Sequence, residues 1–423
     1  MLTIRRTIVL LLLAAATAIL MPGSLSASPT GDDLRINGFI SQGYMNSSGN
    51  NFLSDTRDGS FQFNEVGLAI NSQVNEKLRV GGQFLSRDLG PVGNNDLRLD
   101  WGLADYHWHD LLGFRIGKAK LPMGLYNEGR DSDFLRPMVL LPQSIYDETK
   151  RDLLVAYQGG GIYGNIPLGF LGNMDYQGFL GSINFNDDST LVETLQTSAT
   201  TLVRNPALGG APTNMLTSFS MENNYIGGGS LTINTKLNNM RLGASFFTVD
   251  NDMTFTYVNV NPVPPGTTTA PKTGTGTLRN KAKTVYSIEI PIGRLTLAGE
   301  YGETDRKQVI FGKTNIDGSS QEYYAMATFA VTEALSVSGL FDVYYNLKDD
   351  KNGTEFAANN LKPNYYAYRK DWGVGARYDV NPNWTLKAEY HEVRGGALFM
   401  EAFNANGIEY NWEYFTLKSS FNF

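Results

Sequence analysis

Residues 411–423 read NWEYFTLKSSFNF, and this stretch separates the fold classes open to the chain. Side chains of a β-strand alternate between its two faces, so every second residue shares an environment. One face of this strand is apolar: Phe415, Leu417, Phe421 and Phe423. The other face is polar: Lys418, Ser420 and Asn422. A soluble protein rarely leaves such an aromatic edge strand exposed, so the pattern favours a strand between lipid and water.

The same period-two pattern recurs upstream, and helical periodicity is scarce. Three segments, 78–84, 97–103 and 384–391, show it most clearly. Their apolar faces are Leu78, Val80 and Phe84; Leu97, Leu99, Trp101 and Leu103; and Trp384, Leu386, Ala388 and Tyr390. Their polar faces are Arg79, Gly81 and Gln83; Arg98, Asp100 and Gly102; and Thr385, Lys387, Glu389 and His391. Strands of this kind are typical of a barrel wall with lipid outside and water inside.

The N-terminus predicts export. Arg5 and Arg6 precede an uncharged apolar run over 7–21 that is too short to span a bilayer. Small residues follow this run: Ser24, Ser26 and Ala27. This is the pattern of a signal peptide, with a retained membrane anchor as the alternative. We expect residues 1–27 to be the signal peptide and residues 28–423 to form the exported protein.

Composition narrows the remaining classes. The chain has 423 residues and 0 cysteines, which excludes disulfides and thiolate metal sites. Its formal net charge is −7 and its cations are scattered singly, so nucleic acid is not expected as a partner. After the signal, no apolar stretch approaches the roughly 18 residues of a spanning helix. A membrane protein without such stretches must close its backbone hydrogen bonds as a barrel; a secreted β-sandwich or β-helix is the soluble alternative.

Connections between the predicted strands come in two alternating kinds. Short turns are expected at 75–77, 109–113, 168–173, 237–239, 291–293, 332–334 and 381–383, and long polar loops at 186–222, 259–281 and 349–368. Short turns on one rim and long loops on the other are typical of outer-membrane barrels. We therefore predict an all-β fold, a transmembrane antiparallel β-barrel of about sixteen strands. The predicted strands are 33–45, 60–74, 78–87, 96–108, 114–121, 152–165, 175–186, 223–236, 240–258, 283–291, 295–312, 320–332, 335–348, 369–381, 384–398 and 411–423.

One long connection, residues 121–151, is strongly apolar, although it is the third outer loop of the predicted barrel. Its apolar residues include Phe134, Leu135, Met138, Val139, Leu140, Leu141, Ile145 and Tyr146. Loops normally run over a wet surface, so this segment must pack against something, and the lumen wall is nearest. The segment also carries five carboxylates: Glu128, Asp131, Asp133, Asp147 and Glu148.

Strand parity directs a set of basic residues into the lumen: Arg35, Arg79, Arg98, Arg115, Arg377, Lys387 and Lys418. Acids on an infolded loop opposite a basic wall would create a transverse field across a wet constriction and orient polar solutes. Asp100, Asp379 and Glu389 on the same wall dilute the asymmetry, and simple solvation of all these charges is the alternative. If the acids line the narrowest point, neutralising Asp131 and Asp133 shifts selectivity toward anions, most strongly at low salt.

Lys118 and Lys120 complete the candidate pore-lining set, but their direction is ambiguous. They share strand parity with Phe114 and Ile116, so simple alternation aims them at lipid. A lysine at the bilayer midplane costs about 2–4 kcal/mol. We therefore expect either a bulge near Gly117, or a strand end protected by the following loop or by a neighbouring subunit.

Two further motifs are interpreted without catalytic or metal chemistry. Gly159-x-Gly161-x-x-Gly164 matches a dinucleotide fingerprint by spelling, but it lies in a strand pattern with no helix after it. We interpret it as small residues where the infolded loop packs. His107-Trp108-His109 has no third metal ligand in sight and fits an interfacial aromatic girdle. No nucleophilic serine elbow is present, so we expect no catalytic residue, no metal and no cofactor.

Residues 117–128, GKAKLPMGLYNE, resemble the start of the third loop in the Gram-negative outer-membrane porin superfamily, of general and phosphate-selective porin type. The run from Arg136-Pro137 through Leu141-Pro142-Gln143-Ser144 to Tyr146 is similar to the continuation of that loop. The resemblance implies an infolded constriction loop over 122–151 and a homotrimer in the cell outer membrane. The terminal Phe423 resembles the signal read by the outer-membrane barrel assembly machinery.

The function implied by this resemblance is passive diffusion. Small hydrophilic solutes and ions would cross a water-filled channel, with outer-membrane lipid around it and no enzyme activity. The first alternative is a substrate-specific channel of the same fold, selective for phosphate or other anions. The second is an outer-membrane barrel enzyme or adhesin that uses the barrel as an anchor.

Overall fold

The computed structural model describes residues 33–90, 92–185, 190–261, 267–360, 362–399, 403–404 and 406–423. The predicted signal peptide, residues 1–27, lies outside these described residues.

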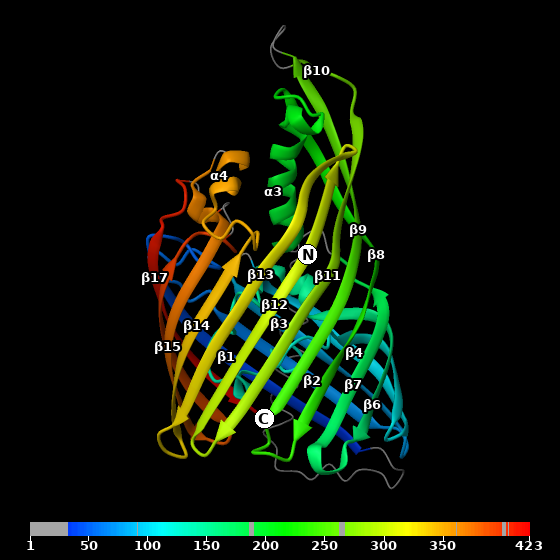
Figure 1. Ribbon diagram of the computed structural model, residues 1–423, viewed down its shortest axis with the longest axis vertical. Helices are drawn as coiled ribbons and strands as arrows, with labels where there is room; N and C mark the ends of the chain where they lie inside the picture. The colour runs from blue at the N-terminus through cyan, green and yellow to red at the C-terminus, as the bar shows by residue number, and fades with distance from the viewer. Residues whose placement is uncertain are drawn as a thin grey trace, which may run out of the picture.

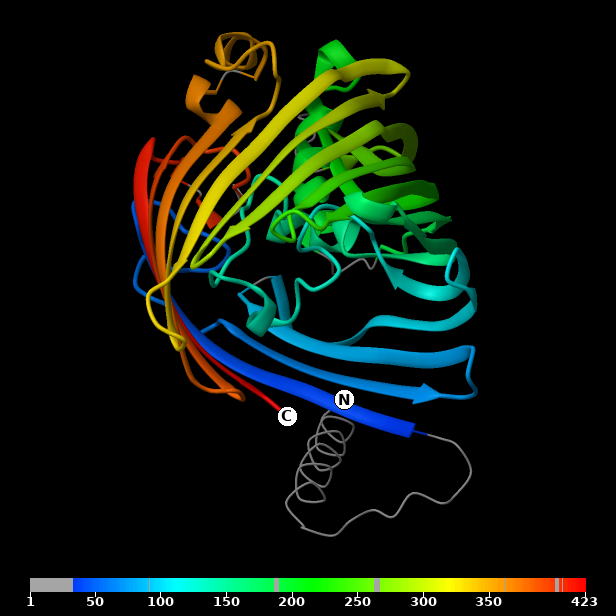
Figure 2. The same cartoon turned by 60° about the horizontal axis from the view of Figure 1, so that its bottom comes forward.

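Sixteen long antiparallel strands and one of two residues form a single closed sheet (Figures 1 and 2). The long strands are β1 (Asp33–Ser48), β2 (Asn64–Gln73), β3 (Leu78–Leu89), β4 (Val92–His109), β5 (Leu112–Lys120), β6 (Ala156–Pro167), β7 (Gly172–Ser182), β8 (Asn214–Thr235), β9 (Arg241–Asn261), β11 (Lys272–Ile292), β12 (Leu295–Ile310), β13 (Lys313–Ala330), β14 (Leu335–Tyr345), β15 (Tyr368–Asn381), β16 (Trp384–Arg394) and β17 (Asn411–Asn422). The short strand β10 (Thr267–Thr268) pairs only with β9. Pairing of β1 with β17 closes the ring, so the predicted sixteen-stranded barrel is confirmed.

The outer face of the barrel is apolar, as the alternation predicted. On β17 the side chains of Phe415, Leu417 and Phe421 are exposed, whereas those of Tyr414 and Lys418 are buried on the inner side. An apolar band around a closed barrel is the surface that a lipid bilayer requires. Among the described residues, no helix is long and apolar enough to cross a membrane.

The alternation changes phase within β4. A register shift in the pairing of β4 with β3 leaves Asp100 as an extra residue. Leu97 and Leu99, before it, are exposed, but Leu103, after it, packs into an inner apolar cluster. A β-bulge turns the following side chains to the other face. The prediction that Leu97, Leu99 and Leu103 share one face is therefore wrong at Leu103.

Both ends of the described sheet lie on the rim of short turns. β1 begins at Asp33, which pairs with Gln73 beside the turn at 74–77. At the other end, the N–H of Asn422 donates to the carbonyl of Asn383, in the turn between β15 and β16, over 3.0 Å. β1 therefore begins, and β17 ends, on the same rim. The two strands pair from Phe39 with Asn422 to Ser48 with Glu413.

All three of the predicted long outer loops contain regular structure, and that at 349–368 holds the short helical pieces α4 (Thr354–Asn360) and η5 (Asn364–Ala367). The connection expected at 186–222 holds α3 (Thr190–Arg204), the short η4 (Pro206–Leu208) and the first residues of β8, while β11 begins at Lys272 inside the loop expected at 259–281. β8, β9 and β11–β13 extend beyond the rest of the wall, with α3 alongside them (Figure 1). Strands that leave the lipid need no apolar face, so residues such as Thr273 and Thr275 give no period-two hydropathy signal.

Short helical pieces lie in several of the connections. They are α2 (Arg151–Leu154), α4 (Thr354–Asn360), η1 (Asp133–Leu135), η2 (Glu148–Lys150), η3 (Gly169–Leu171) and η5 (Asn364–Ala367). The helix α3 is anchored by Ala199 and Val203, which are buried in the same inner cluster as Phe255 and Ile310. The outer end of the barrel is therefore partly filled from within.

Deleting Phe423 tests the seam of the barrel. The backbone of Phe423 exchanges two hydrogen bonds of 3.0 Å with Gly38, and its ring occupies the space beside the Gly38 backbone. Without these contacts and the terminal aromatic, we expect the chain to be exported but poorly inserted, with loss of the heat-modifiable band on gels. Phe423→Tyr keeps the ring and the backbone and should insert normally. Heat-modifiable migration that survives the deletion would contradict the prediction.

Candidate functional site

The connection between β5 and β6 has little regular structure, yet nearly all of it is buried. It holds only η1, η2 and α2. In Figure 2 it lies within the ring of strands. Residues 122–151, the predicted constriction loop, are called the inner segment below.

Two apolar clusters join the inner segment to inward-facing side chains of the wall. In the first, Met123, Met138, Leu141, Ile145 and Tyr146 pack with Ile226, Phe247, Ala298, Tyr324, Met326 and Leu340. In the second, Val139 and Leu140 pack with Met45, Phe52, Phe63, Val393, Trp412 and Tyr414. Burial of apolar surface contributes roughly 25 cal/mol per Å², so these contacts favour a segment held against the wall. Six of the eight apolar residues named from the sequence thus have their packing partner. The prediction is wrong at Leu135, which is 66% exposed, and Phe134 is only half-buried.

Wall carboxylates accept hydrogen bonds from backbone N–H groups of the inner segment. Glu300 on β12 accepts from Leu125 over 2.8 Å, and Asp342 on β14 accepts from Ser144 over 3.1 Å. Glu389 on β16 accepts from the N–H groups of Val139 and Leu140. Buried backbone donors need partners, and here the wall supplies them because these four residues lie outside the short helical pieces of the segment.

Wall cations donate to the carbonyl groups of the same segment. The ammonium of Lys387, on β16, reaches the carbonyl oxygens of Asp133 (2.5 Å), Arg136 (2.8 Å) and Met138 (3.2 Å). Arg377 on β15 donates to the carbonyl of Phe134 over 2.7 Å. We call these donors and the three carboxylates above the wall clamp, because together they hold both kinds of backbone group.

The acid nearest the barrel seam, Asp133, is enclosed by cations. Its carboxylate accepts from Ser420 Oγ over 2.6 Å and lies 2.7 Å from Arg136, 3.2 Å from Lys387 and 3.5 Å from Lys418. Burial acts to raise the pKa of Asp133, but these cations outweigh it and hold that pKa well below its usual value. Asp133 is therefore a structural anion.

The other acids of the segment are neutralised in the same way. Asp131 contacts Lys120 and Arg151. Glu148 lies 2.9 Å from both Arg87 and Arg130. Asp147 lies 2.8 Å from Lys150. Burial acts to raise the pKa of Glu148, and the arginines, led by Arg130, lower it overall.

These contacts correct the predicted transverse field. Asp131, Asp133, Asp147 and Glu148 are buried, with at most 6% of their surface exposed, so they do not project into a wet aperture. Glu128 is the exposed acid of the five, and it accepts a hydrogen bond from Gln177 on β7 over 3.1 Å. The expected separation between acidic loop and basic wall fails because the two are in contact.

The predicted basic residues fall into two groups. Arg377, Lys387 and Lys418 touch the inner segment or its acids. The others lie away from it: Arg35 is exposed on β1, Arg98 lies 3.7 Å from Asp96, and Arg79 and Arg115 lie 3.2 Å and 3.1 Å from Asp105. The first group holds structure together, and the second remains near the accessible inner surface.

Lys118 and Lys120 are accommodated by different means. Lys120 ends β5, and its ammonium contacts the carboxylates of Asp100 and Asp131, which agrees with the expected strand end protected by the loop. Lys118 donates to the carbonyl of Leu99 over 2.6 Å, beside the bulge at Asp100. Gly117 has a φ of +130°, but the pairing of β5 is unbroken there. The bulge is therefore in β4 and not at Gly117.

Sequence patterns revealed Lys120, Lys387 and Lys418, but not the other cations that neutralise the acids. Arg130, Arg136 and Arg151 lie within or directly after the acidic segment, and Arg87 comes from β3. The three-residue spacing of Asp133 and Arg136 across a tight turn could have indicated a local ion pair. Nothing in the sequence placed Arg87 near Glu148, because that pairing depends on the path of the loop.

The two other motifs have structural roles. Gly159, Gly161 and Gly164 lie in β6, and a side chain on Gly159 would meet the backbone of Leu180 on β7. Close strand pairing, and not packing of the loop, requires glycine there, which corrects our interpretation. His107, near the end of β4, lies 3.2 Å from Asp110. Within the described ranges, no group of three His, Asp or Glu residues could hold a metal ion.

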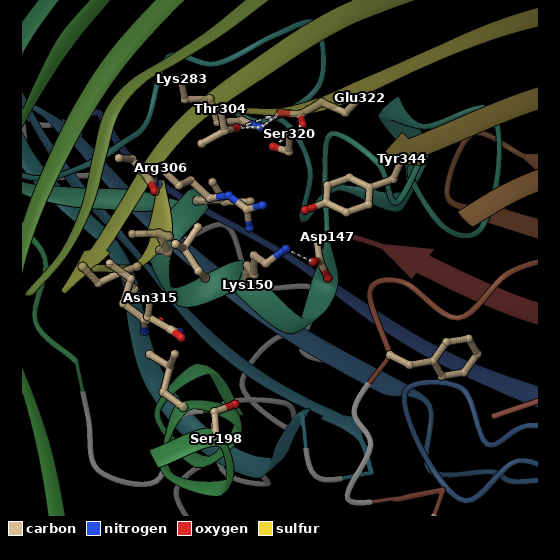
Figure 3. A pocket seen from close by; sticks show the side chains of 18 of the residues that line it. Asp147, Lys150, Ser198, Lys283, Thr304, Arg306, Asn315, Ser320, Glu322 and Tyr344 are labelled. Atoms are coloured by element: carbon tan, nitrogen blue, oxygen red, sulfur yellow. Dashed lines mark hydrogen bonds and ion pairs between the residues drawn. The ribbon is translucent and has the colours of Figure 1, made fainter. Parts of the chain in front are cut away.

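A cavity of about 970 Å³ borders the inner segment. It is lined by residues of the segment, of α2 and α3, and of β11–β14 (Figure 3). Lys150, Lys283, Arg306 and Lys362 bring four cations to its lining, and Asp147 and Glu322 bring two carboxylates. Lys283 contacts Glu322, so this pair is neutral.

A closed barrel of sixteen antiparallel strands with an apolar outer face and a segment bound to its inner face defines the fold of an outer-membrane β-barrel. No protein-family model matches the chain, and no curated protein does. Solved structures do match. OmpT, expressed in the outer membrane of Vibrio cholerae, gives a TM-score of 0.54 at 10% identity, over 94% of this chain and 99% of that one.

Two porins are similar to the same extent. OmpF of Salmonella typhi, in complex with daunomycin, gives a TM-score of 0.52 at 12% identity, over 93% of this chain and 98% of that one. An anion-selective porin from Comamonas acidovorans gives 0.51 at 9% identity, over 93% and 100%. Identities this low establish the fold alone. The resemblance to Gram-negative outer-membrane porins is confirmed at that level, and the fold is consistent with the cell outer membrane.

Replacing Lys387 by methionine tests the wall clamp. The variant leaves three carbonyl groups without their donor and removes one cation from Asp133. Breaking a buried ion pair from one side costs about 3–5 kcal/mol, so we expect a lower heat-modification temperature. Lys77→Met, on the exposed turn at 74–77, is the matched control and should behave as the wild type. Equal temperatures for Lys387→Met and wild type would refute the clamp.

The acidity of Asp133 gives a second test. A lowered folded-state pKa means that the stability from this group is complete above the unfolded value of about 4 and is lost below it. The difference in heat-modification temperature between wild type and Asp133→Asn should therefore stay constant from pH 7 to about pH 5 and shrink below about pH 4. A difference that already shrinks between pH 7 and pH 5 would show that Asp133 is not held ionised by its cations.

Proposed function

We propose that the chain is a porin, a water-filled channel through which small hydrophilic solutes and ions diffuse passively across the outer membrane. The observation that carries this proposal is the wall clamp, which fixes the inner segment to the inner face of the barrel by its backbone. A segment fixed in this way would narrow the lumen. In this proposal residues 122–151 are the constriction loop.

The inner surface outside the clamp suits a hydrated path. Arg79, on β3, keeps 50% of its side chain exposed although it pairs with Asp105. Arg115 lies beside Gln177, to which it donates over 3.1 Å, and Gln177 in turn donates to Glu128. Polar groups that are partly exposed can exchange hydrogen bonds with water and solutes. Glu128, Arg79 and Arg115 lie near one another on this surface, and their partly exposed charges would give the channel its remaining field.

The proposal includes no enzyme activity. Of the histidines that a hydrolase could use as a base, His391 is buried between Asp371 (2.8 Å) and Glu389 (3.3 Å). His107 and His109 lie in the last three residues of β4, next to a short turn. A substrate-specific channel is the second candidate function, because the cavity beside the inner segment brings four cations and two carboxylates together.

The assembly proposed with this function is a homotrimer, inserted by the barrel assembly machinery. It follows from the porin resemblance, and the exposed apolar outer face supports it as a surface for lipid and for neighbouring copies. Cross-linking in native outer membranes would give a ladder that ends at three copies. A ladder that ends at one copy would exclude the trimer.

Conductance in planar bilayers tests the channel. Purified protein should add discrete current steps whose size rises with salt, and a salt gradient should give a reversal potential. Glu128→Gln should move that potential toward anion selectivity, most clearly in dilute salt where screening is weak. Asp131→Asn, at a buried and paired acid, is the comparison variant and should shift it less. Absence of current steps from correctly folded protein would refute the porin proposal.

A further inference from the structure

We propose that the cavity beside the inner segment is a binding site for a small organic carboxylate, held between Arg306 and Lys150 with its apolar body against α2 and α3. The inference rests on the proposed channel function and names the class of solute that the channel would favour. Three observations carry it: an uncompensated cation, a second cation facing it, and an apolar wall of the right size.

Arg306, on β12, is the uncompensated cation. Its Nη2 atom donates to the backbone oxygen of Asn346 (2.7 Å) and to the side-chain oxygen of Asn346 (2.8 Å), which are both neutral acceptors. Its Nε atom is buried and has no hydrogen-bond partner. Among the described residues, no carboxylate forms an ion pair with Arg306, whose side chain is half-buried in the cavity lining. An anion beside this guanidinium would supply the missing partner.

Lys150, at the end of η2, faces the same space (Figure 3). Its ammonium lies 2.8 Å from Asp147 and 5.5 Å from the centre of the Tyr344 ring. Burial acts to lower the pKa of Lys150, the Asp147 carboxylate raises it above its usual value, and the nearby Arg306 charge again acts to lower it. Arg306 and Lys150 therefore face the cavity, and Asp147 pairs with Lys150. The excess charge of these three groups is positive.

The rest of the lining selects for a ligand with an apolar part. Leucines of α2 and α3 and two residues of the strands form this wall: Leu153, Leu154, Leu195, Leu202, Leu278 and Ile316. The cavity volume of about 970 Å³ falls within the usual range for small-molecule sites. An inorganic anion would leave the apolar wall unused, whereas an aromatic or branched carboxylate would cover it. A guanidinium is also suited to carboxylates because its N–H groups match their two oxygens.

The position of the cavity gives this site a role in transport. α3 and β11–β13 belong to the outer end of the barrel, and Lys150 and Leu153 belong to the connection that borders the lumen. A solute that enters from outside would meet the cavity before it passes the inner segment. Binding there raises the local concentration of carboxylates at the constriction, which is how a charged cleft increases the rate of entry.

Block of the potassium chloride current by benzoate tests the site in planar bilayers. Benzoate should reduce the wild-type current in a saturable way, and benzamide, its neutral analogue, should not. Arg306→Gln should raise the half-blocking concentration about tenfold, since charged hydrogen bonds contribute more than neutral ones. Arg306→Lys should keep part of the block, and Lys348→Gln, at an exposed rim lysine paired with Glu303, should keep all of it.

Three results would overturn the proposal. Block by benzoate that is unchanged in Arg306→Gln would remove Arg306 from the site, provided that the variant keeps its heat-modifiable migration. Equal block by benzamide would show that charge is not recognised. Equal block by inorganic phosphate would show that the apolar wall is not used.

Calorimetry separates this inference from the channel proposal. Titration of benzoate into detergent-folded protein measures binding whether or not the protein conducts. Binding that is lost in Arg306→Gln, from a protein that gives no current, would refute the channel and support the site. Current without any calorimetric binding would support the channel and refute the site.

Discussion

The hydrogen bonds from the ammonium of Lys387 to three carbonyl groups between Asp133 and Met138 are the interaction on which the inner segment depends. A loop that leaves water without forming a helix or a ladder must find a partner for every buried N–H and C=O. Lys387 supplies three donors at one point, and Glu300, Asp342 and Glu389 supply acceptors at others. The barrel wall thereby supplies the hydrogen-bond partners that secondary structure supplies elsewhere. Side chains of β12, β14, β15 and β16 hold the loop in its shape.

This solution uses charges for structure, and those charges are then no longer available to solutes. Asp131, Asp133 and Glu148 each meet two or more cations, and the cations of the wall that meet them are equally occupied. Such a network exerts only a weak electric field on solutes in the lumen, because the fields of opposite charges in contact cancel at a distance. Selectivity then depends on charges whose partners are absent, neutral or partly hydrated, such as Glu128 and Arg306.

The fold could be predicted from the sequence because lipid imposes its pattern on each strand separately. Phe415, Leu417 and Phe421 face outward for a reason that needs no knowledge of the neighbouring strands. Three features could not be predicted in this way. The bulge at Asp100 has no hydropathy signature, and the apolar face of α3 packs against the inside of strands beyond the lipid. The third feature is the set of ion pairs formed by the acids. Asp133 and Lys418 are far apart in the chain, and only the closure of β17 onto β1 brings β17 and its Lys418 to the loop. Parity gave the direction of each side chain, but not its distance from the loop.

The contrast between Asp133 and Arg306 separates structural charge from functional charge. Asp133 is surrounded by three cations and a hydroxyl, so adding another ligand would gain nothing. Within the part of the chain that the structure describes, Arg306 is held by the two oxygens of Asn346, which fix the orientation of the guanidinium without cancelling its charge. A group that is oriented but not neutralised is preorganised for an anion, since the cost of ordering the side chain is met by the fold before any ligand arrives. Beside an apolar wall, such a group discriminates by charge and by shape together.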